Sequence, residues 1–474
     1  MSKLTAKQIA PFLIFAAVAV AALFIKPDVV LGSHEQYNGA DIAWILVATA
    51  LVFLMTPGLA FFYGGMVHRK NVISTMIKSV VAAGVVGVLW VVVGYSLAFG
   101  KSIGGVIGDP STHLFFKDVL SGAPVLGPGA GDTAIKLSIP LSLFALFQMM
   151  FAVITPGLVV GAVAERIRFT SYILFTVLFS LLVYAPLAHW SWSPEGFLFK
   201  WGALDFAGGT VVHISAGCAA LAGALVLKRR KSHIENREIP PANVPYVLIG
   251  TGLLWFGWFG FNAGSALGAN ALSISAFATT NTAAAAAGLS WMFFDVARGK
   301  KPSVLGFCIG AVVGLVAITP AAGFVSVPHS IFIGGVAAII SNFAVHFKQK
   351  SKLDDTLDVF PCHGIGGMVG MLLTGLFATK AIGNTSVTDE GLFISGNAKF
   401  FFTQVKALAI VVTYSFVVSY LIFKFINLIL PMRVSEQDEE LGLDASQHNE
   451  KYMQGTLLVH SNGAFVEKPV EQED

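Results

Sequence analysis

The stretch DFAGGTVVHISAG, from Asp205 to Gly217, places an aspartate and a histidine inside a long apolar run. A charged aspartate near the centre of a bilayer costs about 2.5–3.5 kcal/mol on insertion scales, so it needs hydrogen-bond donors or access to water. The stretch therefore predicts a helix that lines a polar path inside a membrane protein rather than one that faces lipid.

The composition of the whole chain is that of a membrane protein. Of its 474 residues, 55% are hydrophobic and 12% are charged, and the mean hydropathy is +0.74. Soluble domains have about 45–50% apolar and about 25% charged residues. As spans of about 20 residues, this length makes one helical bundle. The net charge of +3 gives no indication of nucleic-acid binding. The three cysteines lie in apolar runs, so neither a disulfide framework nor a metal site is expected, and no cofactor is predicted.

Eleven apolar runs predict an all-α polytopic bundle in the inner (plasma) membrane. Arg and Lys concentrate in every second connection, and the positive-inside rule places those loops in the cytoplasm. Because the number of spans is odd, the bundle begins outside and ends inside. The predicted spans are 42–67, 77–100, 137–163, 170–190, 205–227, 244–264, 275–297, 303–322, 328–347, 359–379 and 402–430.

Three segments follow from these runs. Residues 1–41 hold Lys3 and Lys7 before the apolar PFLIFAAVAVAALFI, with small residues in VLGS at 30–33, so they predict a signal peptide followed by a periplasmic segment. An uncleaved anchor helix is the alternative. Residues 42–430 form the predicted channel domain. Residues 431–474, which contain EQDEELGLDASQHNE, are an acidic cytoplasmic tail.

The opening stretch has a counterpart later in the chain. Asp205 precedes His213 by eight residues and Asp355 precedes His363 by eight, and small residues follow each histidine. The two copies lie on the fifth and tenth predicted spans, five helices apart. An odd number of helices per repeat inverts the second copy relative to the membrane, so the spacing predicts an inverted five-helix repeat with its site near the midplane. Two matched imidazoles can share a hydrogen bond and still offer a donor or an acceptor to a small solute, so they predict a pore lining. For Asp205 we expect a helix-packing role in which backbone N–H groups and hydroxyls satisfy the carboxylate, with an electrostatic contribution to cation binding as a by-product.

Several motifs resemble those of the ammonium transporter family (Amt, methylammonium permease and Rhesus proteins). They are TPGLAFFYGGMVHRKNV, ERIRF, GALDFAGGTVVH, WFGFNAGSA, DVFPCHGIGGMVG and GLDASQHNE. The resemblance covers about residues 40–455 and is strongest to the bacterial Amt branch. It implies eleven helices, a homotrimer in the lipid bilayer, a narrow hydrophobic pore in each subunit, and a regulatory tail that cooperates with a PII-type signal protein.

The resemblance also assigns site residues. Trp192 and Ser265 would bind ammonium at the outer site, with Phe147 and Phe151 beside them and Asp205 beneath. Phe151 and Phe261 would form the gate, and His213 and His363 would line the pore. Trp190 is the alternative to Trp192, because the loop before Asp205 is longer here than in the usual family pattern.

The expected function is transport of ammonium, with methylammonium as an analogue. A bare ion entering a low-dielectric tube costs on the order of 20 kcal/mol in the Born limit, whereas a cation–π contact contributes roughly 0.5–2 kcal/mol. Deprotonation between Trp192 and His213 is therefore predicted, with passage of ammonia. An ammonium sensor that acts through its tail is the alternative. Neither an HExxH motif nor a P-loop is present, so an enzyme is not expected.

Overall fold

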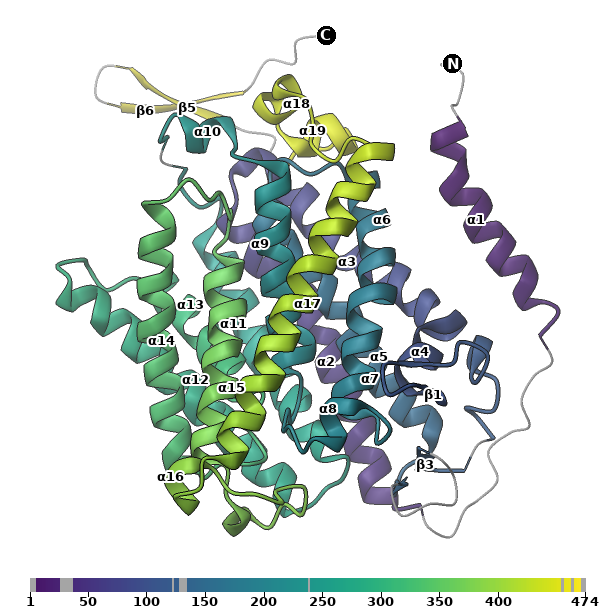
Figure 1. Cartoon of the computed structure of the whole chain (residues 1–474). Coiled ribbons are helices and arrows are strands. Elements are labelled where there is room, and N and C mark those ends of the chain that lie inside the picture. The colour runs from purple at the N-terminus through teal and green to yellow at the C-terminus, as the bar shows by residue number, and fades with distance from the viewer. Residues whose placement is uncertain are drawn as a thin grey trace.

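The computed structural model describes residues 6–25, 37–121, 123–127, 134–237, 239–452, 456–461 and 464–469. Most of these residues are helical, and the long helices run side by side in one bundle (Figure 1). We call the end that carries the C-terminal segment the tail side and the opposite end the far side. The predicted cleavage region at 30–33 lies outside the described residues.

The described part of the chain contains nine helices long and apolar enough to cross a membrane. They pack with α12 (Ala271–Ala297) and the shorter apolar α13 (Val304–Ile318), which completes the eleven-helix bundle that the sequence predicts. The nine are α2 (Gly39–Met66), η1–α3–η2–α4 (Arg69–Phe99), α5 (Leu141–Val163), α6 to α8 (Phe169–Lys200), η5–α9 (Gly209–Leu227), α11–η6–η7 (Val244–Ala266), α14 (Val327–Gln349), η8–α15 (Phe360–Phe377) and α17 (Lys399–Ile429).

Burial separates a central helix from peripheral ones. In α5, 89% of the most apolar 18-residue window is buried, whereas the corresponding share is 28% in Arg69–Phe99 and 33% in α17. The helix α5 therefore forms the middle of the bundle, and the other two present much of their apolar surface outward, as lipid-facing helices do.

Five of the spans contain a π-helical segment, and three of these segments carry predicted pore residues. They are η2 (Trp90–Gly94), η4 (Ser180–Tyr184), η5 (Gly209–Ile214), η6 (Phe259–Ala263) and η8 (Phe360–Ile365). The segments η5, η6 and η8 hold His213, Phe261 and His363, in that order. Single π-helical turns within α-helices are frequent at functional sites because they redirect side chains.

The two Asp–His helices run in opposite directions. Asp205 lies just before η5 and accepts hydrogen bonds from its first turn at the far side. Asp355 lies just before η8 and does so at the tail side, where the neighbouring Asp354 contacts Arg230. They cross where Gly217 meets Gly364: a Cβ on Gly217 would lie 2.3 Å from the Gly364 Cα. The small residues after each histidine therefore allow the two helices to approach, and the crossing matches the inverted repeat.

Short elements close the two ends. On the far side lie two antiparallel strand pairs and the helices η3 (Leu114–Phe116), η9 (Lys380–Ile382) and α16 (Leu392–Ser395). The strand pairs are β1 (Ser102–Ile103) with β2 (Ile107–Gly108), and β3 (Val125–Leu126) with β4 (Ile135–Lys136). On the tail side lie α10 (Lys231–Ile234), α18 (Glu436–Leu441) and α19 (Leu443–His448).

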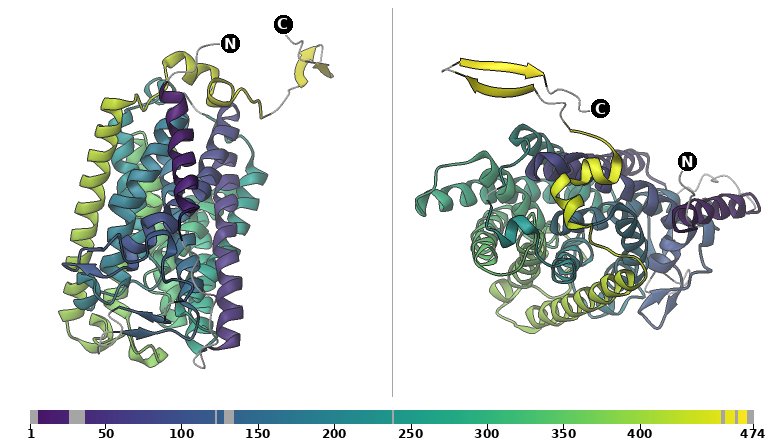
Figure 2. Two further views of the ribbon diagram at one scale, coloured as in Figure 1. Left: turned by 90° about the vertical axis from the view of Figure 1, so that its right-hand side faces the viewer. Right: turned by 90° about the horizontal axis from the view of Figure 1, so that it is seen from above.

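The two ends of the chain stand apart from the bundle. Figure 2 shows α1 (Ala6–Ala22) as a separate helix beside it, and the antiparallel pair β5 (Thr456–Ser461) and β6 (Ala464–Pro469) beyond its tail side. The side chains of α1 from Ala10 onward are mostly exposed, so this apolar helix contributes little to the core.

Candidate functional site

A row of aromatic rings leads from the far side toward the two histidines. The ring of Phe151 packs edge-on against Trp192 at 5.8 Å and against Phe147 at 4.9 Å between centroids. It also lies 4.3 Å from the ring of Phe261. Phe151 and Phe261 are both almost fully buried. Residues from α5, α7 (Ala185–Trp192) and η6 thus meet in one aromatic cluster.

The two candidate tryptophans have different surroundings. Trp190 is 4% exposed and donates its indole N–H to the Val106 carbonyl. Its ring packs against Tyr414 and Phe197 rather than against Phe151. Trp192 is half-buried, packs on Phe151 and donates its indole N–H to the Asp205 carbonyl at 3.0 Å. Its position beside the aromatic row favours Trp192 over Trp190 as a site residue.

Ser265 lies at the end of the same helix as Phe261. Its hydroxyl donates to the Phe261 carbonyl at 2.8 Å, and the residue is half-buried. The hydroxyl oxygen keeps lone pairs free to accept a hydrogen bond from a cation. The contact fixes Ser265 to the helix turn that carries Phe261.

Both carboxylate oxygens of Asp205 accept hydrogen bonds from the turn that directly follows it. One oxygen accepts from the backbone N–H groups of Gly208 and Gly209, at 2.9 and 2.6 Å. The other accepts from the N–H of Thr210 at 2.8 Å and from its hydroxyl. Gly208 has φ +113°, a conformation that favours glycine, and this turn brings the three amides together. Asp205 therefore caps the histidine helix, which matches the packing role considered above.

Asp355 does the same at the opposite end. Its two oxygens accept from the backbone N–H groups of Val359 and Phe360, at 3.0 and 2.7 Å. Burial raises the pKa of Asp355 to about 6, although the charge of Lys348 opposes this. The shared eight-residue spacing thus reflects a shared device, an aspartate that caps the first turn of a histidine helix.

The two histidines form a pair. His363 Nδ1 lies 3.3 Å from His213 Nδ1, and the rings are stacked with centroids 5.5 Å apart. His213 also stacks on Trp258 at 5.3 Å and on Phe261 at 5.9 Å. Its Nε2 atom is buried and has no hydrogen-bond partner among the described residues. That nitrogen is available to a small polar molecule, as an orphaned buried group usually finds a partner.

A small cavity lies against this pair. Its volume is about 10 Å³, roughly one water-sized molecule. Apart from the two imidazoles its walls are apolar, so they can admit a small neutral molecule but cannot replace the hydration shell of an ion. The lining residues are Met55, Leu59, Phe62, Ile154, Leu158, Val212, His213, Leu254, Trp258, Phe261, Val312 and His363.

Trp258, the first residue of WFGFNAGSA, also lines the cavity, and its role was not predicted from the sequence. Its ring stacks on His213 at an interplanar angle of 17°, and its indole N–H donates to the Thr319 hydroxyl at 2.9 Å. The signal that could have found it is its spacing, three residues before Phe261 on the same helix face.

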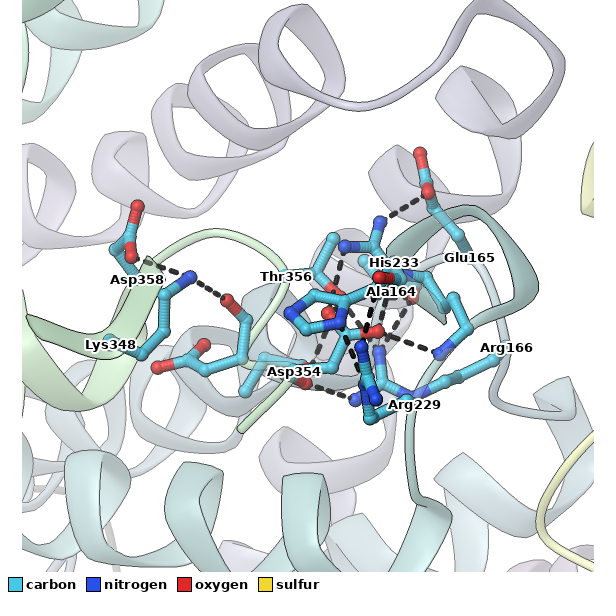
Figure 3. A network of polar contacts seen from close by, with 12 residues as sticks. Ala164, Glu165, Arg166, Arg229, His233, Lys348, Asp354, Thr356 and Asp358 are labelled. Atoms are coloured by element: carbon cyan, nitrogen blue, oxygen red, sulfur yellow. Dashed lines mark hydrogen bonds and ion pairs between the residues drawn. The ribbon is translucent and has the colours of Figure 1, made fainter. Parts of the chain in front are cut away.

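A second polar cluster lies on the tail side (Figure 3). Arg230 pairs with Glu165 at 2.5 Å and with Asp354 at 2.8 Å, and the buried Arg166 donates to the Asp354 carbonyl at 2.5 Å. Burial alone would raise the pKa of Asp354, but hydrogen bonds from Arg230 and the charges of both arginines outweigh it and hold that pKa well below its ordinary value. The cluster joins the ends of α5 and α9 to the turn before η8.

The tail packs onto this side of the bundle. Both carboxylate oxygens of Asp444 accept from the first turn of α3 (Val72–Leu89), from the N–H groups of Ile73 and Ser74 at 3.1 and 2.7 Å. Leu443 is fully buried, and its N–H donates to the Asn71 side chain at 2.8 Å. Gly442 has φ +101° and lies so close to Lys70 that a Cβ would meet it at 2.5 Å. The GLD sequence at 442–444 thus holds the tail against the first turn of α3 and the residues just before it.

Comparison with known proteins gives one consistent result. A model of the Ammonium Transporter Family matches residues 43–453. An ammonium transporter of Aquifex aeolicus is 46% identical over 421 residues, which cover 88% of this chain and 94% of the relative. The crystal structure of Saccharomyces cerevisiae Mep2 is similar at 36% identity with a TM-score of 0.78, covering 85% and 92% of the two chains. A sensor Amt protein is similar at 30% identity with a TM-score of 0.77, covering 86% and 98%.

Proposed function

The chain belongs to the ammonium transporter family, and we propose that it takes ammonium at an outer site, removes a proton and conducts ammonia through the histidine-lined pore. It is a multi-pass membrane protein that transports ammonium and is not an enzyme. The observation that carries the mechanism is the buried His213–His363 pair beside a cavity of about 10 Å³ with otherwise apolar walls.

Recognition begins at the aromatic row. Trp192, Phe147 and Phe151 present ring faces and edges beside Ser265, whose hydroxyl can accept a hydrogen bond. Such contacts replace part of the hydration of ammonium and contribute roughly 0.5–2 kcal/mol for each cation–π pair. Methylammonium, with the same charge and three N–H donors, fits the same contacts. Asp205 supports this site through the Trp192 indole and through its charge, while its own hydrogen-bonding capacity is used by the helix cap.

The proton is lost at the constriction. Passing a bare cation between Phe151 and Phe261 would remove its water without replacing it, at a cost on the order of 20 kcal/mol in the idealised Born limit. Burial also lowers the pKa of ammonium groups by up to about 3–5 units, which makes deprotonation the easier route. Neutral ammonia then passes the gate and hydrogen-bonds to the imidazoles.

The orientation of the molecule follows from its charges. The basic loops that the sequence predicts on one side meet the tail, because Lys70 and Lys231 contact Glu440 and Arg168 contacts the Arg433 carbonyl. The positive-inside rule then puts the tail side in the cytoplasm and the aromatic row outside, in an inner (plasma) membrane. Residues 1–41 would supply the signal or anchor, 42–430 the channel and 431–474 the regulatory tail.

The remaining parts of the proposal are a regulatory role for the tail and assembly into a homotrimer. Docking of residues 442–444 against α3 supports a regulatory role for the tail, together with a PII-type signal protein, and we propose a homotrimer with one pore in each subunit. Deletion of the residues after Arg433 tests the tail: unaltered rate and unaltered response to nitrogen status would remove this part.

Ammonium-evoked current across supported membranes tests the transport mechanism. A wild-type current that disappears in His213→Ala would support charge movement along the histidine pair. Absence of current together with saturable methylammonium uptake would show net movement of the neutral gas. If neither appears, the sensor alternative gains support, for which the similarity to a sensor Amt protein is the observation.

A further inference from the structure

A Thr-Pro pair at the end of α13 supports the histidine pair from outside the cavity. Thr319 directly follows Ile318, the last residue of α13, and Pro320 comes next. Thr319 is fully buried, yet it does not belong to the residues that line the cavity beside the histidines. Proline has no N–H group to continue the helix, so the chain turns here. The pair thus places a hydroxyl and a rigid turn in the interior of the bundle.

The Thr319 hydroxyl has two partners, and their chemistry fixes which group donates. The indole N–H of Trp258 can only donate, so the hydroxyl oxygen accepts from it at 2.9 Å. The hydroxyl hydrogen then goes to the Leu315 carbonyl at 2.7 Å. Because the Thr319 N–H donates to the Val316 carbonyl, the hydroxyl replaces the regular helical bond to Leu315. The two bonds together hold the hydroxyl oxygen in one position.

Trp258 connects this fixed oxygen to the histidine pair. Its ring stacks on His213 at 5.3 Å between centroids and 17° between planes. Aromatic contacts are favourable over a wide range of centroid distances, about 4.5–7 Å, so stacking alone allows a ring to slide. A hydrogen bond is shorter and directional, so the bond to Thr319 sets the position of the Trp258 ring. The His213 ring therefore packs on a ring whose position the Thr319 hydroxyl determines.

The histidine pair tolerates little movement of the His213 ring. The two Nδ1 atoms of His213 and His363 lie 3.3 Å apart. A displacement of about 0.3 Å would take them to a separation at which a hydrogen bond no longer exists. The same imidazole is stacked on both Trp258 and His363. A residue that fixes Trp258 therefore also protects the hydrogen bond between the histidines.

Pro320 contacts the histidine helix through a second route. The Phe206 N–H, next in the chain after Asp205, donates to the Pro320 carbonyl at 3.2 Å. Gly209, the first residue of η5, packs so closely on the Pro320 ring that a Cβ would lie 2.6 Å from it. The turn after α13 thus contacts both the helix that carries His213 and the ring that stacks on it.

The contact of Thr319 with another helix distinguishes it from other buried threonines. Thr155 and Thr374 also donate their hydroxyls to the carbonyl four residues back, at 2.6 and 2.8 Å. Neither hydroxyl accepts a side-chain N–H group from the described part of the chain, so each acts on the turn of its own helix. Thr319 makes the same local bond and in addition accepts from Trp258. A purely local role would not need that second bond.

We propose that Thr319 is a positioning residue for His213: its hydroxyl fixes the Trp258 ring, and that ring holds the His213 imidazole within hydrogen-bond distance of His363. This role rests on the proposed function, in which the histidine pair conducts ammonia and moves the proton. Since Thr319 does not line the cavity, it acts through Trp258.

Variants of the full-length protein separate this hydrogen bond from general packing. Thr319→Val removes the hydroxyl with little change of volume, and Thr319→Ser keeps it. Trp258→Phe keeps a ring beside His213 but removes the N–H, so it tests the same bond if Thr319→Val does not fold. The double variant Trp258→Phe/Thr319→Val removes that bond only once. The matched control is Thr374→Val, which loses a buried hydroxyl bonded to a helix carbonyl.

Two measurements are made on each variant. Ammonium-evoked current is recorded on supported membranes at matched protein density. Solid-state NMR of protein labelled with nitrogen-15 in its histidines reports the imidazole nitrogens in bilayers, and His213→Ala and His363→Ala assign the resonances of the pair. The second readout follows the position and tautomers of the pair whether or not the pair carries transport.

We expect current to be about tenfold or more lower in Thr319→Val and in Trp258→Phe, because misplacement by about 1 Å can cost about 100-fold. Thr319→Ser and Thr374→Val should stay near the wild type. The double variant should fall no further than the more impaired single variant, because both changes remove one bond. The resonances of His213 and His363 should change in both single variants.

Wild-type current in Thr319→Val overturns the proposal, as do equal losses in Thr319→Val and Thr374→Val. Single losses that multiply in the double variant overturn it as well. If His213→Ala keeps wild-type current, the proposed function fails, and the imidazole resonances then decide about positioning. A change in Thr319→Val that is absent from Thr374→Val supports the role of Thr319, and unchanged resonances overturn it.

Discussion

The Nδ1 atoms of His213 and His363 face each other at 3.3 Å. A neutral imidazole has one nitrogen that donates and one that accepts, so a hydrogen bond between the two Nδ1 atoms requires opposite tautomers. One Nε2 is then a donor and the other an acceptor, whichever ring holds the shared proton. The pair can therefore offer both kinds of hydrogen bond to ammonia without carrying a charge.

The first prediction concerns this pair. Replacing His213 with alanine removes the shared hydrogen bond and the partner of His363, so we expect ammonium-evoked current to fall about 100-fold or more, the usual scale for loss of a proton-transfer group. Current is measured on solid-supported membranes with matched protein density. His113→Ala is the control and should keep wild-type current, because this half-buried histidine on the far side packs on Tyr95 and not on the His213–His363 pair. A wild-type response in His213→Ala would contradict the proposed path.

The second prediction concerns the gate. In Phe151→Ala/Phe261→Ala the rings that lie 4.3 Å apart are lost, and hydrated cations gain a passage. We expect potassium to carry current in this variant but not in the wild type, because the barrier to a cation is the loss of its hydration. The single variant Phe197→Ala, whose ring packs on Trp190, is the control. Unchanged selectivity for ammonium over potassium would show that the constriction lies elsewhere.

The third prediction concerns the helix cap. Asp205→Ala leaves three backbone N–H groups in a buried turn without their acceptor, at about 1–3 kcal/mol for each unsatisfied group. We expect a clearly lower melting temperature together with lost transport. Thr210→Val removes the hydroxyl contacts with Asp205 and Ser191, keeps the backbone N–H bond to Asp205, and should cost about 1 kcal/mol. If Asp205→Ala melts like the wild type but fails to transport, the carboxylate acts on the substrate rather than on the helix.

The fourth prediction concerns tail docking. Gly442→Ala cannot easily keep φ +101° and would contact Lys70, and Asp444→Ala loses two N–H contacts with α3. Either change should release the tail, which limited proteolysis detects as faster cleavage after Arg433. Asp438→Ala serves as the comparison, since the Asp438 side chain has no hydrogen bond to α3 among the described residues. Equal cleavage rates in all variants would mean that the docked tail does not depend on these residues.

The fifth prediction concerns acid stability. The pKa of Asp354 is held below its ordinary value, so its carboxylate contributes stability that is fully present above the unfolded pKa of about 3.9 and is lost as pH falls below it. Asp354→Asn should lower stability by about 3–5 kcal/mol at pH 7, since Arg230 loses one of its two buried carboxylate partners. The melting temperature of the variant should also depend less on pH between 5 and 3 than that of the wild type. Parallel pH profiles would contradict this assignment.

Much of the architecture was predictable because its signals are local. Apolar runs, the charges of alternate loops and the small residues after each histidine depend on neighbours in sequence, so they predict the eleven helices. The eight-residue Asp–His spacing predicts the repeat because an aspartate can cap only the helix that begins a few residues later. The resemblance to a known family supplied the aromatic row.

The sequence by itself determined that the chain is a helical membrane bundle with two inverted Asp–His helices. Tertiary structure decided which atoms meet: His213 with His363 across 150 positions, Trp192 rather than Trp190 on Phe151, and the tail's Asp444 on the first turn of α3. The reason is that hydrophobic burial depends on composition along each helix, whereas these contacts depend on how closely separate helices approach. That approach is set by packing at positions such as Gly217 and Gly364, and no local pattern encodes the pairing.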